Sequence, residues 1–299
     1  LAFKKLLSSF GTQVPLLSCY RQALADFYCS SLTPGGSGGQ PGQLYAMNKQ
    51  GVPAGVGIAS LLSFNTLYHV VMLLVALFAF FSGATEKVLK LHGLRLLILY
   101  GGLAQVFMVC YYLLFIYSKR LFPKLLSFVV KLYGKVQKKK DPLLLEQKFQ
   151  EQIELFHHCS AHLKRRPLIL LQVMGLLVLL FFFYYLPSFL LYKGLGLSGI
   201  SMMEMVAIQS VAVLALESLP LPGALGVAEG SLFAIYSLLM PADAAFILMA
   251  LTRITSLYFG VMLGGLSTLL LFGEEKKRPL KVSQKLYGPL KHGQANVVV

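Results

Sequence analysis

Two carboxylates, Glu217 and Glu229, bracket a stretch of the sequence that cannot continue as an ordinary membrane helix. The residues that break it are Pro220, Pro222, Gly223, Gly226 and Gly230. Each proline removes a backbone donor and clashes with the preceding turn, while each glycine frees the chain from helical geometry. In hydrocarbon, broken backbone and charged side chains are stable only where protein or a water-filled cavity surrounds them. The stretch therefore marks a candidate functional site.

Arg253 adds a cation in the next apolar segment, at a position predicted to lie at membrane depth. Two interpretations stay open. In the first, Arg253 forms an ion pair with Glu217 or Glu229 and holds the broken stretch in place. In the second, its guanidinium binds a phosphodiester of a ligand while the carboxylates bind an ammonium group. Glu204, in the preceding apolar segment, is a further candidate for the second role.

The composition indicates a protein that crosses a membrane several times. Of its 299 residues, 56% are hydrophobic and 13% are charged, and the mean hydropathy is +0.68, which is too apolar for a soluble domain of this length. The formal net charge is +15, and most basic residues lie in segments 118–166 and 273–299. By the positive-inside rule, both segments face the cytoplasm. Topology and anionic lipid headgroups explain this charge, so we expect no bound nucleic acid.

Four apolar segments are long enough to cross the hydrocarbon core of a bilayer. They are residues 52–81, 91–117, 167–192 and 242–272. Residues 12–45 and 201–240 are interrupted by Gly and Pro, so we predict that each enters the membrane and returns to the same side. Because the chain must cross an even number of times between its two cytoplasmic segments, 201–240 enters from outside and 12–45 from the cytoplasm.

The predicted fold is an all-α, polytopic membrane helix bundle with two re-entrant hairpins that form an inverted repeat. The repeats are residues 1–117 and 167–272, with a basic amphipathic connector at 118–166 and a basic tail at 273–299. The two breaks share the pattern Pro-Gly-x-x-Gly, and such paired breaks place a substrate site near the midplane. The candidate site residues of the first half are Pro34, Gly35, Gly38, Gln40, Arg21 and Asp26.

The other motifs in the sequence do not indicate a nucleotide-binding, hydrolytic or metal-binding site. Residues 194–199 have the spacing of a dinucleotide fingerprint and residues 35–39 that of a nucleophile elbow, but neither follows a predicted strand. His158 and His162 are four residues apart, yet residue 159 is Cys rather than the Glu of a zinc peptidase helix. The four cysteines show no paired spacing, and His69 is interpreted as a packing residue. We therefore expect no metal, cofactor or disulfide framework.

Two blocks of sequence carry a resemblance to a known family. Residues 219–230 read Leu-Pro-Leu-Pro-Gly-Ala-Leu-Gly-Val-Ala-Glu-Gly, and Arg253 follows within Leu-Thr-Arg-Ile-Thr-Ser-Leu-Tyr. The second block is residues 27–41, with Tyr45 and Gly51 after it. Together they resemble the transmembrane region of lysylphosphatidylglycerol synthases, a flippase-like domain family. Position 224 is Ala where that family often has Gly.

The resemblance implies a multi-pass protein of the bacterial inner membrane that moves aminoacylated phospholipid, such as lysyl-phosphatidylglycerol, to the outer leaflet. That transport lowers the attraction of the cell surface for cationic antimicrobial peptides and so contributes to antibiotic resistance. On this basis Glu217 and Glu229 would bind the lysyl ammonium groups, and Arg253 would bind the phosphate.

Two other functions remain open. Complete bifunctional members of the family carry a cytoplasmic acyltransferase domain, so the chain could be the membrane part of a phosphatidylglycerol lysyltransferase, which moves lysine from charged tRNA to phosphatidylglycerol. The tail 273–299 is too short for such a domain, so we expect no transferase activity within this chain. The other alternative is an ion-coupled transporter of small polar solutes. Expected partners are an anionic or aminoacylated phospholipid, a soluble acyltransferase domain or protein, and a second copy of the chain.

Overall fold

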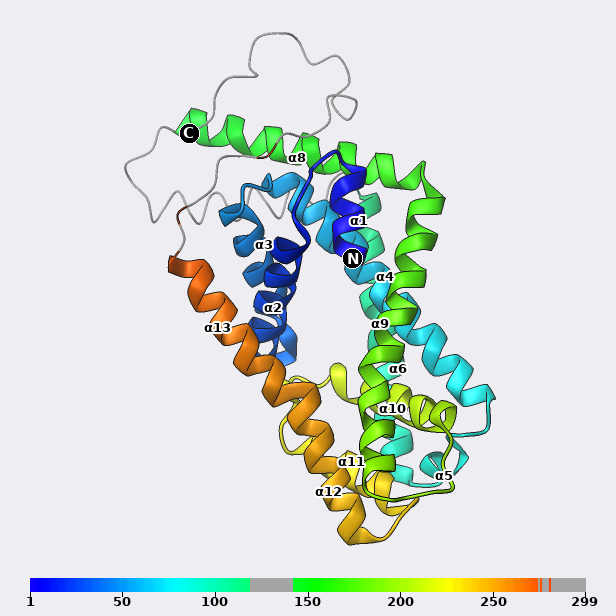
Figure 1. The fold of residues 1–299 in the computed structure, drawn as a ribbon. Helices are drawn as coiled ribbons and strands as arrows, with labels where there is room; N and C mark the ends of the chain where they lie inside the picture. The colour runs from blue at the N-terminus through cyan, green and yellow to red at the C-terminus, as the bar shows by residue number, and fades with distance from the viewer. Residues whose placement is uncertain (119–141, 274, 276–279, 281–299) are drawn as a thin grey trace.

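The computed structural model describes residues 1–118, 142–273, 275 and 280, and the regular structure within them is entirely helical (Figure 1). The elements are α1 (Ala2–Ser9), α2 (Leu16–Leu32), η1 (Pro34–Gly36), α3 (Gly39–Lys49), α4 (Ala54–Phe81), α5 (Glu86–Leu89), α6 (His92–Tyr117), α8 (Pro142–Lys164), α9 (Pro167–Gly194), α10 (Met202–Glu217), η2 (Pro222–Ala224), α11 (Val227–Ser237), α12 (Ala242–Arg253), η3 (Ile254–Tyr258) and α13 (Phe259–Gly273). The all-α prediction is confirmed for these residues. Residues 119–141, the first part of the predicted connector, lie outside them.

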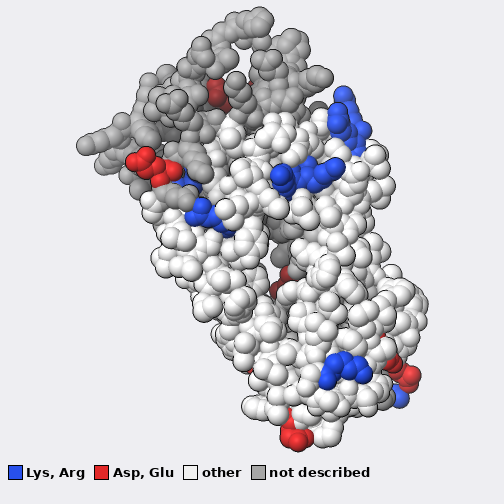
Figure 2. All heavy atoms as spheres, viewed as in Figure 1, with Lys and Arg blue, Asp and Glu red and all other residues white. Residues whose placement is uncertain are grey.

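Four helical segments are long and apolar enough to cross a membrane, and they correspond to the four predicted spans. They are α4, α6, α9 and the segment Ala242–Leu271, which comprises α12, η3 and most of α13. Their outward faces are apolar, and Leu103 and Phe107 of α6 are 73% and 66% exposed. On the face drawn in Figure 2, charged residues gather toward the two ends, and the belt between them is almost uncharged. This distribution is typical of a multi-pass membrane protein.

Helices α1 and α8 close one end of the bundle, here called the α8 end, and their buried side chains share one hydrophobic core. The N-terminus of α4 lies at this end, because the backbone N–H of Gly55 donates to Oε1 of Gln152 in α8 at 2.9 Å. The N–H of Leu280 donates to the carbonyl oxygen of Gly51 at 2.7 Å. The described parts of the two basic segments therefore lie at the same end of the molecule.

Two hairpins, each formed by a helix, a 3₁₀ turn and a shorter helix, reach toward the middle of the bundle from opposite ends (Figure 1). The first, α2–η1–α3, starts and ends at the α8 end, and the second, α10–η2–α11, packs with α5 at the other end. A Cβ on Gly35 would lie 3.9 Å from Cα of Pro220, and one on Gly223 would lie 3.6 Å from the carbonyl oxygen of Ser31. The tips of the two hairpins therefore touch.

Helices α6 and α10 pack so closely that Gly101 has no space for a side chain. A Cβ there would lie 2.2 Å from the carbonyl oxygen of Leu214, whereas one on the next residue, Gly102, would have no atom within 4 Å. We expect Gly101→Ala to lower the free energy of unfolding by about 1–3 kcal/mol through overpacking. Gly102→Ala is the matched control and should not lower it. Unfolding in detergent measures both, and equal stabilities would contradict this packing.

Candidate functional site

The tip of the second hairpin is shaped by η2 and the start of α11. Gly223 has a φ of 57° and Gly226 a φ of 81°, in the left-handed region that glycine adopts most readily. Oε2 of Glu229 accepts a hydrogen bond from the N–H of Gly226 at 2.6 Å. This bond closes the N-terminus of α11 and leaves Oε1 of the same carboxylate for Arg253.

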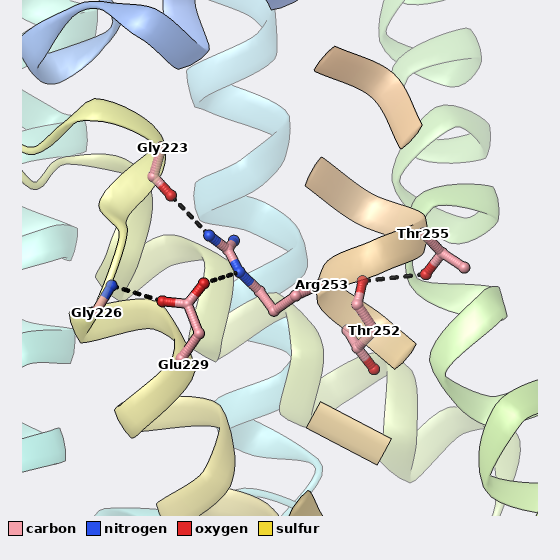
Figure 3. Close-up of polar contacts among 6 residues, drawn as sticks. All are labelled: Gly223, Gly226, Glu229, Thr252, Arg253 and Thr255. Atoms are coloured by element: carbon pink, nitrogen blue, oxygen red, sulfur yellow. Dashed lines mark hydrogen bonds and ion pairs between the residues drawn. The ribbon is translucent and has the colours of Figure 1, made fainter. Parts of the chain in front are cut away.

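Arg253 connects the last membrane segment to this tip (Figure 3). Its Nε donates to Oε1 of Glu229 at 2.7 Å, and its Nη2 donates to the carbonyl oxygen of Gly223 at 2.9 Å. The two side chains are only 11% and 25% exposed, so water screens the pair weakly. The helix opens into the π-helical turn η3 directly after Arg253, a feature that is frequent at functional sites. The geometry is that of an ion pair holding the broken stretch in place.

Ala224 is the one described residue other than glycine with a positive φ, at 51°. This conformation brings Cβ close to the following carbonyl and costs about 1–2 kcal/mol for a residue with a side chain. We expect Ala224→Gly to raise the free energy of unfolding by about 1 kcal/mol, because glycine removes this strain. Ala161→Gly, on the exposed face of α8, should lower it by a similar amount. Thermal unfolding in detergent compares the two, and a destabilised Ala224→Gly would contradict the strain.

The tip of the first hairpin repeats this construction with different side chains. Gly35 in η1 has a φ of 59° and a ψ of 23°, close to the values of Gly223. The hydroxyl of Thr33 accepts a hydrogen bond from the N–H of Gly38 at 2.8 Å. At the start of α3, a Cβ on Gly39 would lie 2.5 Å from Oδ1 of Asp26. The Asp26 carboxylate therefore lies directly beside the tip.

Glu217 and Asp26 are carboxylates at the meeting tips, and among the described residues neither has a cationic partner. Glu217 ends α10, is exposed, and accepts a hydrogen bond from the Tyr68 hydroxyl at 2.9 Å. Asp26 is half-buried and lies close enough to Glu217 for the two charges to interact. Among the residues that the structure describes, no Lys or Arg pairs with either carboxylate. Figure 2 shows acidic atoms deep in a hollow between the two ends of the molecule.

A series of polar side chains connects the two tips through α4 and α6. Gln40 of the first hairpin donates to the hydroxyl of Tyr112, whose ring stacks on His69 with the ring centroids 5.5 Å apart. Nδ1 of His69 hydrogen-bonds to Oε1 of Gln105. Nε2 of Gln105 then donates to the hydroxyl of Ser218 at 3.1 Å, at the second tip. Both α4 and α6 therefore contribute polar side chains to the wall of the site.

The structure brings most of the predicted site residues to the two tips. These are Pro34, Gly35, Gly38, Gln40, Asp26, Glu217, Pro222, Gly223, Gly226, Glu229 and Arg253. Arg21 lies apart from them, on the face of α2 that is turned toward α13. Glu204 lies at the opposite end of α10, where it forms a capping box with Ser201. Its position in the structure is that of a helix cap.

Sequence reasoning missed Tyr68, Gln105 and Tyr112, and it treated His69 as a packing residue. The available signal was their polarity within apolar spans. Gln105 is 1% exposed and Tyr112 is 5% exposed, and buried polar groups at membrane depth require hydrogen-bond partners. A search for polar side chains on predicted spans would have proposed this wall of the site.

The histidines of α8 lie away from the tips. Burial, together with the charge of Arg166, lowers the pKa of His162, so this side chain is neutral at pH 7. Its ring packs 6.2 Å from that of Phe10, measured between centroids. Across the described ranges, no group of His, Cys, Asp and Glu residues has the arrangement of a metal site.

Fold and site together define a multi-pass helical membrane protein in which two broken hairpins meet around polar and charged side chains. The model of one family, described as the lysylphosphatidylglycerol synthase TM region, matches residues 1–264, and the chain belongs to this family. Comparison with curated proteins gives no match, and neither does comparison with solved structures.

Proposed function

We propose that this protein moves a phospholipid with a cationic headgroup, such as lysyl-phosphatidylglycerol, from one leaflet of the membrane to the other. The observation that carries the proposal is the pair Glu217 and Asp26, two carboxylates close to each other at the meeting tips that pair with no Lys or Arg among the described residues. A carboxylate at membrane depth without a partner is costly. A lysyl headgroup, which carries two ammonium groups, would supply the missing charge. Membership of the lysylphosphatidylglycerol synthase TM family supports this class of lipid.

The ion pair of Arg253 and Glu229 has a different role in this proposal from that of the unpaired carboxylates. Both oxygens of Glu229 already accept hydrogen bonds within the protein, so we assign this residue to holding the second tip. Guanidinium has five N–H donors, and the hydrogen bonds of Arg253 to Glu229 and Gly223 use Nε and Nη2. Its remaining donors can bind the phosphate of the lipid.

The two hairpins are proposed to be re-entrant in the membrane and to be related as an inverted repeat. In each, a longer helix, a 3₁₀ turn begun by proline and a helix of 11 residues follow in the same order, and a membrane span comes next. Folds of this kind expose a midplane site to each side in turn by rocking one repeat against the other. We assign the α8 end to the cytoplasm of a bacterial inner membrane, because the described parts of the basic segments lie there.

A leaflet-resolved assay of the full chain in vesicles tests the proposal. Fluorescent lysyl-phosphatidylglycerol is compared with phosphatidylglycerol and phosphatidylcholine that carry the same label, and a membrane-impermeant quencher reports the outer leaflet. We expect the protein to accelerate exchange of the lysyl lipid by about tenfold or more over the other two, equivalent to about 1.4 kcal/mol. Equal acceleration of all three lipids would remove the cationic headgroup from the proposal, and no acceleration would overturn transport itself.

A further inference from the structure

An apolar groove of about 820 Å³ lies between α2 and α13, outside the site at the tips. Its walls include Leu17 and Leu24 on α2 and Leu263, Leu266 and Leu270 on α13. The volume is within the range of pockets that bind organic ligands. Leu17 and Leu266 remain 68% and 59% exposed, so the groove is open along its length rather than enclosed.

The two helices that form the groove pack closely against each other. A Cβ on Gly260 would lie 2.6 Å from the ring of Phe27, and one on Gly264 would lie 2.8 Å from the carbonyl oxygen of Leu24. Such pairs of small residues four apart allow membrane helices to approach one another closely. Along this packed pair, the side chains of Leu17 to Leu24 on α2 and of Leu263 to Leu270 on α13 that are turned outward line the groove.

Among the described residues that line this groove, Arg21 is the charged one, on the same face of α2 as the two leucines. It lies in the second turn of α2, which starts at the α8 end. A basic side chain close to the end of a membrane segment lies at the depth of the lipid phosphates. An apolar groove with a guanidinium in its wall therefore matches a phospholipid, in which acyl chains adjoin a phosphodiester.

We infer that the groove between α2 and α13 binds a phospholipid from the leaflet at the α8 end, with an acyl chain along the leucines and the phosphate at Arg21. The role of this lipid in transport rests on the proposed function, because a lipid held here lies against the hairpin that carries Asp26. The geometry of the groove is independent of the proposed function. The groove supplies a guiding wall for the tail, while the headgroup reaches the polar tips.

Photolabelling of the full chain in nanodiscs tests the groove directly. The probe is a phosphatidylglycerol with a diazirine in one acyl chain, diluted in phosphatidylcholine, and mass spectrometry maps the labelled peptides. Labelling should concentrate on residues 17–24 and 263–270. Leu266→Trp fills the groove and should reduce that labelling by about fivefold or more, a loss of about 1 kcal/mol. The matched control is Leu103→Trp on α6, which is 73% exposed and should leave it unchanged.

Two further variants separate the headgroup contact from the tail contact. Arg21→Gln should reduce labelling by the phosphatidylglycerol probe and by a phosphatidylcholine probe, because both carry the phosphodiester, but not by a diacylglycerol probe with the same diazirine. Arg21→Lys keeps the positive charge and should retain part of the labelling. Uniform labelling of all outward-facing helices, or equal labelling in Leu266→Trp, would overturn the inference. So would groove labelling that appears only after removal of residues 281–299, because the chain itself would then occupy the groove.

The photolabelling experiment and the transport assay distinguish a failure of the groove inference from a failure of the proposed function. Glu217→Gln should slow transport by about tenfold or more while groove labelling persists. Groove labelling without transport in the unmodified protein would overturn the proposed function alone. Transport with uniform labelling would overturn the groove alone.

Discussion

Glu217→Gln is expected to slow translocation of lysyl-phosphatidylglycerol by about tenfold to a hundredfold, because a hydrogen-bonded charge at a binding site contributes about 1.5–3 kcal/mol. The substitution keeps the size of the side chain and the oxygen that accepts the Tyr68 hydrogen bond. Stability should therefore remain near that of the unmodified protein. Initial rates in the leaflet-resolved vesicle assay, with thermal unfolding of the same preparation, measure both quantities.

The matched control is Glu204→Gln, the same chemical change at the other end of α10. Glutamine can replace glutamate in a capping box, so both helix and transport should persist. Asp26→Asn should reproduce the loss of transport, since Asp26 lies close to Glu217 at the meeting tips. Full transport by the Glu217→Gln protein would remove this carboxylate from the mechanism.

Arg253→Met is expected to produce the largest loss of stability, about 2–4 kcal/mol, because it leaves a shielded carboxylate without its cation. The carbonyl oxygen of Gly223 would lose its donor as well. Glu229→Gln should cost less, since an amide oxygen can still accept from Nε of Arg253. Unfolding in detergent, followed by circular dichroism, measures each change.

A double substitution tests whether the two residues act through each other. Arg253→Met combined with Glu229→Gln should cost less than the sum of the single changes, because neither then leaves a lone charge. The control, Arg95→Met, removes an exposed arginine from α6 and should change stability by about 0.5 kcal/mol or less. Strict additivity of the two substitutions would show that the ion pair does not hold the second tip.

The spans and the breaks of this fold could be predicted from the sequence because local chemistry determines them. A run of apolar residues forms a helix in hydrocarbon whatever its neighbours are. Each broken stretch could also be predicted, since Pro222 and Gly223 stop a helix through their own geometry. Pro34 and Gly35 do the same in the first hairpin, and the structure places both pairs in 3₁₀ turns.

The partners of the charged side chains could not be predicted, because they depend on how distant segments meet. Sequence spacing does not decide whether Arg253 pairs with Glu217 or Glu229, and the structure joins it to Glu229. The choice follows from the capping of α11, which turns the Glu229 carboxylate toward the last span. The sequence likewise indicated polar residues such as His69 without indicating that packing of α4 on α6 aligns it with Gln105.

The contact between Gly35 and Pro220 has a consequence for the electrical profile of the membrane. Where water fills the hollow beside two touching tips, most of the transmembrane voltage falls across the thin layer of protein between them. A headgroup that passes this layer then moves through most of the voltage within a few residues. For a lipid with one net positive charge, outward movement against an inside-negative potential of 100 mV requires about 2.3 kcal/mol. If the protein moves such a lipid, as we propose, a gradient of the lipid itself or a cation moving inward would supply that work.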